Sequence, residues 1–236
     1  MVRCGVMREN AGKGRGSVLQ RFVKRGVDVV GATVGLVALA PVMGAAAVAV
    51  RASMGSPVLW KHVRPSRDGE PFTMFKFRTM RPTKDGEVWF RSDADRLTPV
   101  GRFLRKTSID ELPELLNVVI GDMSLVGPRP LLMEYLQRYT PEQHRRHEVR
   151  PGITGWAQVN GRQSIPFSKR LALDVWYVDH QSFLLDVKIL AVTVKQALFG
   201  SGVISGQNVD SVDDLGLSDA VETHGSGASG GARRAH

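Results

Sequence analysis

Two adjacent acidic residues in the middle of the chain, Asp110 and Glu111, are of a type and spacing that could act on a phosphate. They lie in the segment TSIDELPELLNVVIG, residues 107–121. Because proline is tolerated in the first turn of a helix, Pro113 predicts a helix start near Asp110, where free N–H groups and the helix dipole favour an anion. An ionised aspartate there could attack phosphorus and form an aspartyl phosphate, and Glu111 could help to hold a metal ion. The spacing of Ser108 and Glu111 equally suits a capping box, with Asp110 as a structural cap.

Two later loops carry side chains suited to binding phosphate. Arg129 stands between two prolines in GDMSLVGPRP, residues 121–130. Its direction is therefore fixed at little entropic cost, which suits a bidentate phosphate clamp. The glycines of RPGITGWAQVNGR, residues 150–162, would let the backbone approach a ligand. The polar candidates in that loop are Arg150, Asn160 and Arg162. Either loop could equally be structural only.

The elements that must position these side chains include a β-hairpin. The runs PVLWKHVRP, residues 57–65, and PFTMFKFRTM, residues 71–80, flank the turn-like SRDGE. Alternation in the second run places Lys76 and Arg78 on one face of the strand and two phenylalanines on the other.

The other predicted elements are mainly helical. Residues 98–136 have a helical pattern that GPRP interrupts at 127–130. Two amphipathic helices are predicted over residues 167–181 and 183–199. Such helices could belong to the core, or they could lie in a membrane interface with the apolar face down.

An uncharged segment near the amino terminus predicts a membrane anchor. Residues 29–50 contain no charge, and as one helix these 22 residues would be about 33 Å long, enough to cross a bilayer. Pro41 near the middle removes a backbone hydrogen bond and bends a helix. Basic residues flank both ends, and positive charge marks the cytoplasmic side. The pattern suits a helix that enters the membrane, turns at Pro41 and returns; a kinked transmembrane helix and a buried core helix are the alternatives.

The charge of the chain indicates a polyanionic partner. Lysine and arginine number 32 against 23 acidic residues, for a formal net charge of +9. Nucleic acid, an anionic membrane surface and phosphorylated substrates all fit such an excess. A nucleic-acid-binding protein would not explain the apolar segment or the Asp-Glu pair, so no nucleic acid partner is expected. A non-enzymatic membrane scaffold would explain only the anchor.

Several motifs in a fixed order resemble the bacterial sugar transferases, the monotopic phosphoglycosyl transferases, over residues 21–199. These motifs are KRGVDVV (24–30), GSPVLWKHVRP (55–65), FTMFKFRTM (72–80), TSIDELPELLNVVIGDMSLVGPRPLLMEY (107–135), RPGITGWAQVNGR (150–162) and LDVWYVDHQSFLLDVKIL (173–190). A Ser-Pro pair is common at the helix break of this family, and Ala40-Pro41 replaces it here, so the bend lacks the contribution of the hydroxyl.

The resemblance implies transfer of a sugar 1-phosphate from a UDP-sugar to polyprenyl phosphate, through an aspartyl-phosphosugar intermediate and with release of UMP. Asp110 and Glu111 would be the catalytic pair and would hold Mg²⁺. The resemblance implies phosphate-binding arginines, and we add one lysine, one arginine and one asparagine to the expected substrate-binding set. That set is Arg105, Arg129, Arg150, Arg162, Lys76, Arg78 and Asn160.

The expected architecture is a small α+β monotopic enzyme with a re-entrant helix-break-helix, a short β-hairpin and amphipathic interfacial helices, on the cytoplasmic face of the inner membrane. We expect a basic arm over 1–20, a re-entrant helix over 21–51, a catalytic domain over 52–202 and a disordered tail over 203–236. The expected partners are a UDP-sugar, polyprenyl phosphate and anionic lipids, and a homodimer is compatible with the sequence. The sugar and the glycan, whether exopolysaccharide, capsule, O-antigen or glycoprotein glycan, stay open.

Overall fold

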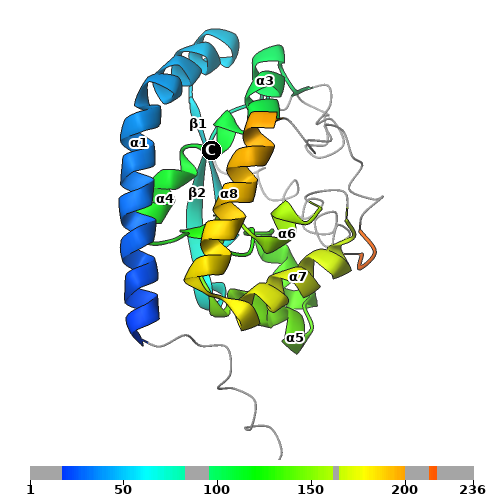
Figure 1. The fold of residues 1–236 in the computed structure, drawn as a ribbon. Coiled ribbons are helices and arrows are strands. Elements are labelled where there is room, and N and C mark those ends of the chain that lie inside the picture. Colours follow the sequence, from blue (N-terminus) through cyan, green and yellow to red (C-terminus); the bar gives the residue numbers. More distant parts are fainter. Residues whose placement is uncertain (1–17, 83–95, 162–164, 200–212, 217–236) are drawn as a thin grey trace, which may run out of the picture.

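The computed structural model describes residues 18–82, 96–161, 165–199 and 213–216 (Figure 1). A long helix, α1 (Val18–Met54), runs along one side of a body of shorter helices and two two-stranded sheets. This mixture of helix and sheet confirms the expected α+β class. The elements that follow α1 are β1 (Leu59–Pro65), η1 (Arg67–Gly69), β2 (Pro71–Phe77), α3 (Pro99–Thr107), η2 (Ile109–Glu111), α4 (Glu114–Ile120), β3 (Ser124–Val126), η3 (Met133–Arg138), α5 (Pro141–His144), η4 (Arg145–Glu148), β4 (Gly152–Thr154), α6 (Trp156–Val159), α7 (Phe167–His180) and α8 (Phe183–Phe199).

Helix α1 is continuous through 37 residues and contains Pro41. Figure 1 shows that it changes direction toward its C-terminal end, as a proline ring and a missing N–H donor cause in a helix. The expected break is therefore a bend within one helix. Within the part of the chain that the structure describes, α1 is the one helix long and apolar enough to cross a membrane. Re-entry at Pro41 stays a prediction.

The inner face of α1 packs against the body of the molecule through small residues. Ala32 is completely buried in a cluster with Leu115 and Val118 of α4, and with Phe72 of β2. A Cβ added at Gly35 would lie 3.3 Å from a methyl group of Leu115, so the two helices approach closely. Small side chains on this face thus let α1 lie directly against α4, the helix that follows the Asp-Glu pair.

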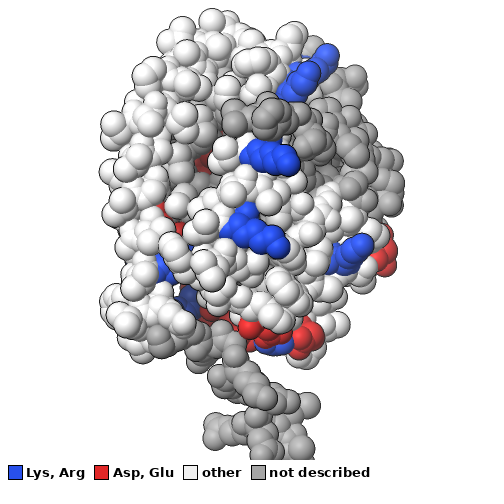
Figure 2. All heavy atoms as spheres, in the orientation of Figure 1, with Lys and Arg blue, Asp and Glu red and all other residues white. Residues whose placement is uncertain are grey.

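The outer face of α1 is apolar and exposed. Val30, Val34 and Val37 are each more than 60% exposed. Figure 2 shows that the surface over most of α1 carries neither acidic nor basic side chains. An apolar surface of this extent on a folded protein marks contact with a membrane or another protein.

The expected hairpin is confirmed, and its register explains the place of Lys76. Strands β1 and β2 pair antiparallel, with Trp60 opposite Lys76. Phe72 and Met74 of β2 lie on the same face as Lys76, because side chains alternate along a strand, and both are buried against α1 and α4. That face therefore directs the Lys76 side chain toward the segment that carries the Asp-Glu pair.

A second, parallel sheet was not expected. Strand β3 falls within the stretch predicted as mainly helical, and it pairs with β4, where a loop was predicted. That part of the helical prediction is wrong, because three-residue strands are too short for alternation to show in a sequence. The close approach depends on glycine. A Cβ at Gly152 would lie 2.1 Å from the backbone N of Gly127, so the pairing fixes the start of the loop that carries Arg129.

The two predicted C-terminal helices are confirmed as α7 and α8. Helix α7 buries Leu171 and Tyr177, whereas Phe183 and Leu184 at the start of α8 are exposed. The structure describes residues 213–216 of the segment expected as a disordered tail, and that expectation stays a prediction. Asp214 accepts a hydrogen bond of 3.0 Å from the backbone N–H of Ser168, so it satisfies a free donor in the first turn of α7.

Candidate active site

A sharp change of direction between α3 and α4 places Asp110. Helix α3 ends at Ser108, whose φ of 57° is left-handed. A single 3-10 turn, η2, then holds Asp110, and α4 begins at Glu114. The predicted helix start near Asp110 therefore lies one turn too early. The capping-box interpretation is also wrong, because the Ser108 side chain makes no cap hydrogen bond.

The Asp110 side chain is buried, and among the described residues it has no hydrogen-bond or ion-pair partner. Burial, and after it the charge of Glu111, raises the pKa of Asp110 to about 6, against the opposing effect of Lys76, Arg105 and Arg129. Near neutral pH the carboxylate is thus ionised, poorly solvated and surrounded by cations that do not bind it. Such a carboxylate keeps its lone pairs free for attack on an electrophile.

Glu111, by contrast, is fully engaged. Arg129 Nη1 lies 3.3 Å from Oε2, Arg129 Nη2 also bonds to Oε1, and Lys76 Nζ lies 2.8 Å from Oε1. Although burial opposes ionisation, Arg129 and Lys76 together hold the pKa of Glu111 well below its usual range. Glu111 therefore acts as the anionic anchor that fixes two cations beside Asp110.

A third carboxylate, Glu114, completes this group and was missed in the sequence. It lies in the first turn of α4 and is 1% exposed, with Oε1 3.0 Å from Lys76 Nζ. Burial raises the pKa of Glu114 to about 7, and the charge of Lys76 opposes the rise. Lys76 therefore bridges two carboxylates, Glu111 and Glu114. The one signal in the sequence was the i, i+3 spacing of these two residues, which places them on one side of a helical turn.

Two further arginines lie around this group. Arg105 on α3 donates from Nε to Thr79 Oγ1 at 3.0 Å, and its charge lowers the pKa of Asp110. Arg64 on β1 received no role from the sequence. Its Nε is buried without a hydrogen-bond partner, and burial, then the charge of Arg129, lowers its pKa to about 10. A desolvated guanidinium with an unsatisfied donor is costly, so Arg64 is suited to bind an anion.

Three predicted substrate-binding residues donate hydrogen bonds to backbone carbonyl groups, and their role in substrate binding stays a prediction. Arg78 donates to the carbonyl groups of Met54 and, at 3.0 Å, Ser56, where α1 ends. Arg150 donates from Nε to the carbonyl of Gly121 at 2.8 Å. Asn160 is the third of these residues and donates to the carbonyl of Trp156 at 2.8 Å within its own turn. The last candidate, Arg162, lies outside the described residues.

The backbone of Arg129 is held by a buried ion pair that the sequence did not reveal. Arg146 donates from Nη2 to the Arg129 carbonyl at 2.6 Å and to Asp174 Oδ2 at 2.7 Å. Both Arg146 and Asp174 are buried. A paired, hydrogen-bonded charge of this kind can persist in the interior, and here it fixes the loop on which Arg129 reaches Glu111.

A divalent metal would find few free ligands beside Asp110. Within residues 18–82, 96–161, 165–199 and 213–216, no three His, Cys, Asp or Glu side chains lie together so that they could hold a metal ion. Both oxygens of Glu111 already accept bonds from cations. Mg²⁺ is commonly held by one or two carboxylates together with water and substrate phosphates. The donor set fits an ion that arrives with a diphosphate and does not form a protein cage.

Comparison of the sequence with known proteins gives a family match for this chain. Residues 19–200 match the family described as Bacterial sugar transferase. The chain is 59% identical, over 65% of its length, to the "Uncharacterized sugar transferase EpsL" of Bacillus subtilis (strain 168), and this match covers 76% of that protein.

Two relatives with more specific names are longer than this chain. One is the "UDP-glucose:undecaprenyl-phosphate glucose-1-phosphate transferase" of Escherichia coli (strain K12), 39% identical over 75% of this chain and 40% of the relative. The other is the "UDP-N-acetylgalactosamine-undecaprenyl-phosphate N-acetylgalactosaminephosphotransferase" of Aeromonas hydrophila, 37% identical over 79% of this chain and 46% of the relative. The matched region thus covers less than half the length of each of these two proteins.

Proposed function

Because this chain belongs to the bacterial sugar transferase family, we propose that it transfers a sugar 1-phosphate from a UDP-sugar to polyprenyl phosphate. The observation that carries the proposal is the buried Asp110 carboxylate, which has no hydrogen-bond or ion-pair partner among the described residues. Burial raises its pKa, and the charges of Lys76, Arg105 and Arg129 lower it. A nucleophile placed among cations suits an electrophile that carries several negative charges, as a sugar diphosphate does.

The proposed reaction has two displacements at one phosphorus atom. An Asp110 oxygen attacks the phosphorus that bears the sugar, the bond from that phosphorus to the bridging oxygen breaks, and UMP leaves. The phosphosugar is then bonded to Asp110 as an acyl phosphate, a mixed anhydride. An oxygen of polyprenyl phosphate attacks the same phosphorus, the bond to Asp110 breaks, and the free carboxylate is restored. The products are UMP and a polyprenyl-diphospho-sugar.

The cations of the site offset the charge that builds up on the phosphoryl oxygens. Arg129 and Lys76 are fixed by Glu111, so little reorganisation is needed when a phosphate arrives. Arg64 supplies a buried guanidinium whose Nε has no hydrogen-bond partner among the described residues. Mg²⁺ belongs to the proposal as well: Asp110 would hold it, with Glu111 beside it, and the ion would offset charge on the phosphates.

Release of UMP tests the proposal directly. Membranes that contain the protein are incubated with UDP-glucose, UDP-galactose or an N-acetylated UDP-amino sugar, with and without polyprenyl phosphate. One donor should give sustained UMP release that depends on the acceptor. Without acceptor, the covalent intermediate should limit release to at most one UMP per enzyme, as a burst. Absence of UMP with every donor and acceptor combination contradicts the proposed reaction.

The pKa of Asp110 predicts the acid limb of the pH profile. Since Asp110 attacks as a carboxylate and its pKa is raised to about 6, protonation should remove the nucleophile as the pH falls through that value. We expect kcat/KM for the UDP-sugar, which reports on the free enzyme, to fall about tenfold per unit below pH 6. A profile that stays flat down to pH 5 would show that ionisation of Asp110 does not limit the reaction.

We extend the proposal to topology: α1 re-enters, and the catalytic residues lie on the cytoplasmic face of the inner membrane. Pro41 divides the uncharged run into arms of 12 and 9 residues, each about 14–18 Å long. Neither arm spans a core of about 30 Å, so each reaches roughly the midplane. The basic residues that flank both ends favour the cytoplasmic side for both.

Replacing Pro41 by leucine tests re-entry, because it removes the obstacle to a straight helix and adds apolar surface. Cys4 is the single cysteine of the chain and serves as a reporter for the amino-terminal side. In intact cells, a membrane-impermeant thiol reagent should not label the wild type, whereas a fraction of Pro41→Leu molecules should be labelled. Lysed cells give the total signal. Strong labelling of the wild type in intact cells would mean that α1 crosses the bilayer once.

A further inference from the structure

The loop that carries Arg129 is held at its start as well as at its end. Arg146 binds the carbonyl of Arg129, and three side chains surround the carbonyl of Val126, three residues earlier. Lys24 Nζ and Tyr177 Oη each lie 3.2 Å from that oxygen, and Ser124 Oγ lies 2.9 Å from it. The position of Arg129 therefore depends on what binds the Val126 carbonyl.

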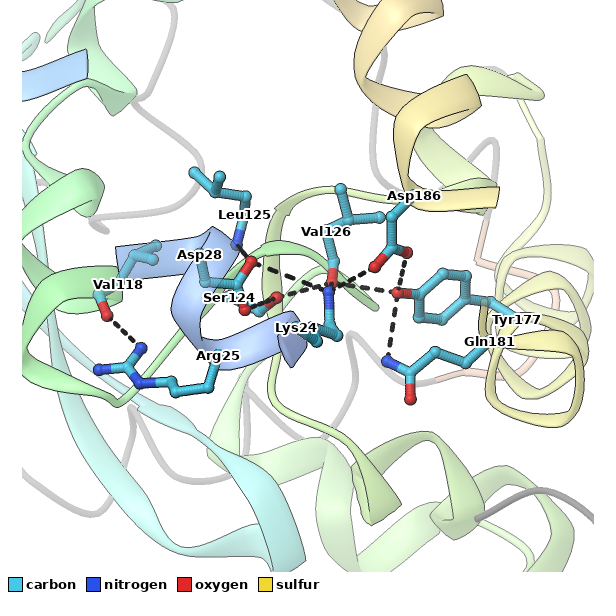
Figure 3. Close-up of polar contacts among 10 residues, drawn as sticks. All are labelled: Lys24, Arg25, Asp28, Val118, Ser124, Leu125, Val126, Tyr177, Gln181 and Asp186. Atoms are coloured by element: carbon cyan, nitrogen blue, oxygen red, sulfur yellow. Dashed lines mark hydrogen bonds and ion pairs between the residues drawn. The ribbon is translucent and has the colours of Figure 1, made fainter. Parts of the chain in front are cut away.

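Hydrogen counting shows which of the three donors binds it. A hydroxyl carries one hydrogen, whereas an ammonium group carries three. Tyr177 Oη lies 2.6 Å from Asp186 Oδ1, and Ser124 Oγ lies 2.8 Å from a carboxylate oxygen of Asp28. A carboxylate is the stronger acceptor, so we assign both hydroxyl hydrogens to carboxylates, which leaves Lys24 as the donor to Val126. Figure 3 shows the contacts of these side chains with the Val126 carbonyl.

The Lys24 side chain also links α1 to α8. Its Nζ lies 2.7 Å from Asp186 Oδ2 on α8, and Figure 3 shows it between α1, the Val126 carbonyl and Asp186. A cavity of about 260 Å³ lies between the apolar side chains of α1 and α8 at this point. The side chains that line it include Leu19, Val23, Val27, Phe183, Val187 and Leu190. The connection between the two helices here is therefore polar and passes through Lys24.

Neighbouring residues of α1 hold the chain that leads into the loop. Arg25 donates to the carbonyl groups of Val118, at 2.6 Å, and Val119, at 3.0 Å, near the end of α4. Asp28 accepts from the backbone N–H of Leu125 at 3.1 Å. A shift of α1 is thus transmitted to the strand β3, to which the Arg129 loop is attached.

We propose that Lys24 is a positioning residue for Arg129. Lys24 on α1 binds both the Val126 carbonyl and Asp186. Arg129 therefore lies beside Glu111 and Asp110 only when the apolar helix α1 is in place. The inference rests on the proposed function, in which Arg129 binds phosphate. It adds a coupling between the apolar helix and the reaction centre: an enzyme whose α1 is displaced would bind substrate and turn over slowly.

The variants Lys24→Met and Arg21→Met form a matched pair. Arg21 lies three residues before Lys24 on α1 and is exposed, so its loss removes the same charge without touching the loop. We expect Lys24→Met to lower kcat about 10- to 100-fold, as small displacements of a reacting group do, with KM and membrane association little changed. Lys24→Arg should retain most activity, because a guanidinium can also donate to both partners. Equal activity of the two methionine variants would overturn the proposal.

A double-mutant cycle separates positioning from a general loss of structure. In an Arg129→Lys background, Lys24→Met should have little further effect on kcat, whereas in the wild type it has its full effect. Equal effects in the two backgrounds would show that Lys24 acts independently of Arg129 and would refute the coupling. If Lys24→Met does not fold, Asp186→Asn is used in the same cycle, because it removes the charge that fixes Lys24 and keeps an acceptor for Tyr177.

Amide hydrogen exchange tests the coupling without any reaction. Peptides that cover residues 124–131 should exchange faster in Lys24→Met than in Arg21→Met or the wild type, since the Gly127 N–H bond to Thr154 O, 2.9 Å long, opens more often. Unchanged exchange would refute the positioning role even if UMP release confirms the proposed reaction. Faster exchange in a protein without transferase activity would confirm the coupling and contradict the proposed reaction.

Discussion

Asp110→Asn is expected to reduce UMP release by about 10⁴-fold or more, as loss of a covalent nucleophile does in other enzymes. Asparagine keeps the shape of the side chain, but its amide is neutral and cannot form the proposed aspartyl phosphate. Because Asp110 has no hydrogen-bond or ion-pair partner among the described residues, the substitution removes no side-chain bond between them. The effect should therefore fall on chemistry, and the acceptor-independent burst of UMP should disappear with turnover.

The same substitution has a predictable sign on stability. Burial raises the pKa of Asp110 to about 6, so above pH 6 the folded chain carries a carboxylate that would be better solvated in the unfolded state. The neutral amide removes this unfavourable charge, and thermal unfolding at pH 8 should occur at the same temperature as in the wild type or higher. The exposed Asp214→Asn is a control that should keep full activity. Wild-type UMP release from Asp110→Asn would contradict the covalent mechanism.

The parts of the fold that the sequence predicted well have a repeated pattern behind them. The hairpin of β1 and β2 shows alternation around a turn, and α7 and α8 are long enough for a helical period to be visible. The uncharged run of α1 is distinctive by composition alone. In each case the signal is local, so no knowledge of distant contacts was needed.

The elements that were missed depend on contacts between distant residues. Strands β3 and β4 are three residues each and pair in parallel across 28 positions of the chain, Ser124 with Gly152. Helix α3 ends at Ser108, which turns left-handed, and α4 begins only at Glu114; nothing in the residue type of a serine requires that conformation. Short, non-local pairings and a single turn at Ser108 leave no periodicity to detect.

The candidate site divides in the same way. Residue type marked Lys76, Arg105 and Arg129 as phosphate-binding candidates; the structure places their charges around Asp110, and phosphate binding stays a prediction. Residue type could not show that Arg78 and Arg150 donate hydrogen bonds to backbone carbonyls. An arginine that binds phosphate and one that binds a helix end look alike in a sequence. Equally, the acids and bases that position others are visible only once the chain is folded. These are Glu114, Arg146, Asp174 and Lys24.

Arg129→Lys is expected to lower kcat about 100-fold or more, the range found when one preorganised charge-stabilising donor is removed. Lysine keeps the positive charge but replaces a planar fork by a single ammonium group. Arg129 now bonds to both oxygens of Glu111, and a lysine that reaches Glu111 cannot offer the same two parallel donors to a phosphate. KM for the donor should change less than kcat if the clamp acts mainly on the charge that develops during transfer.

Arg150→Lys is the matched control, since Arg150 is exposed and spends its Nε donor on the Gly121 carbonyl. UMP release by this variant should stay close to that of the wild type. The two substitutions remove the same chemical group. A difference in UMP release between them therefore reports on the guanidinium beside Glu111 and not on the overall positive charge of the protein. If lysine served as well as arginine at position 129, the field alone would suffice, and the rigid Gly-Pro-Arg-Pro loop held by Arg146 would have no catalytic purpose.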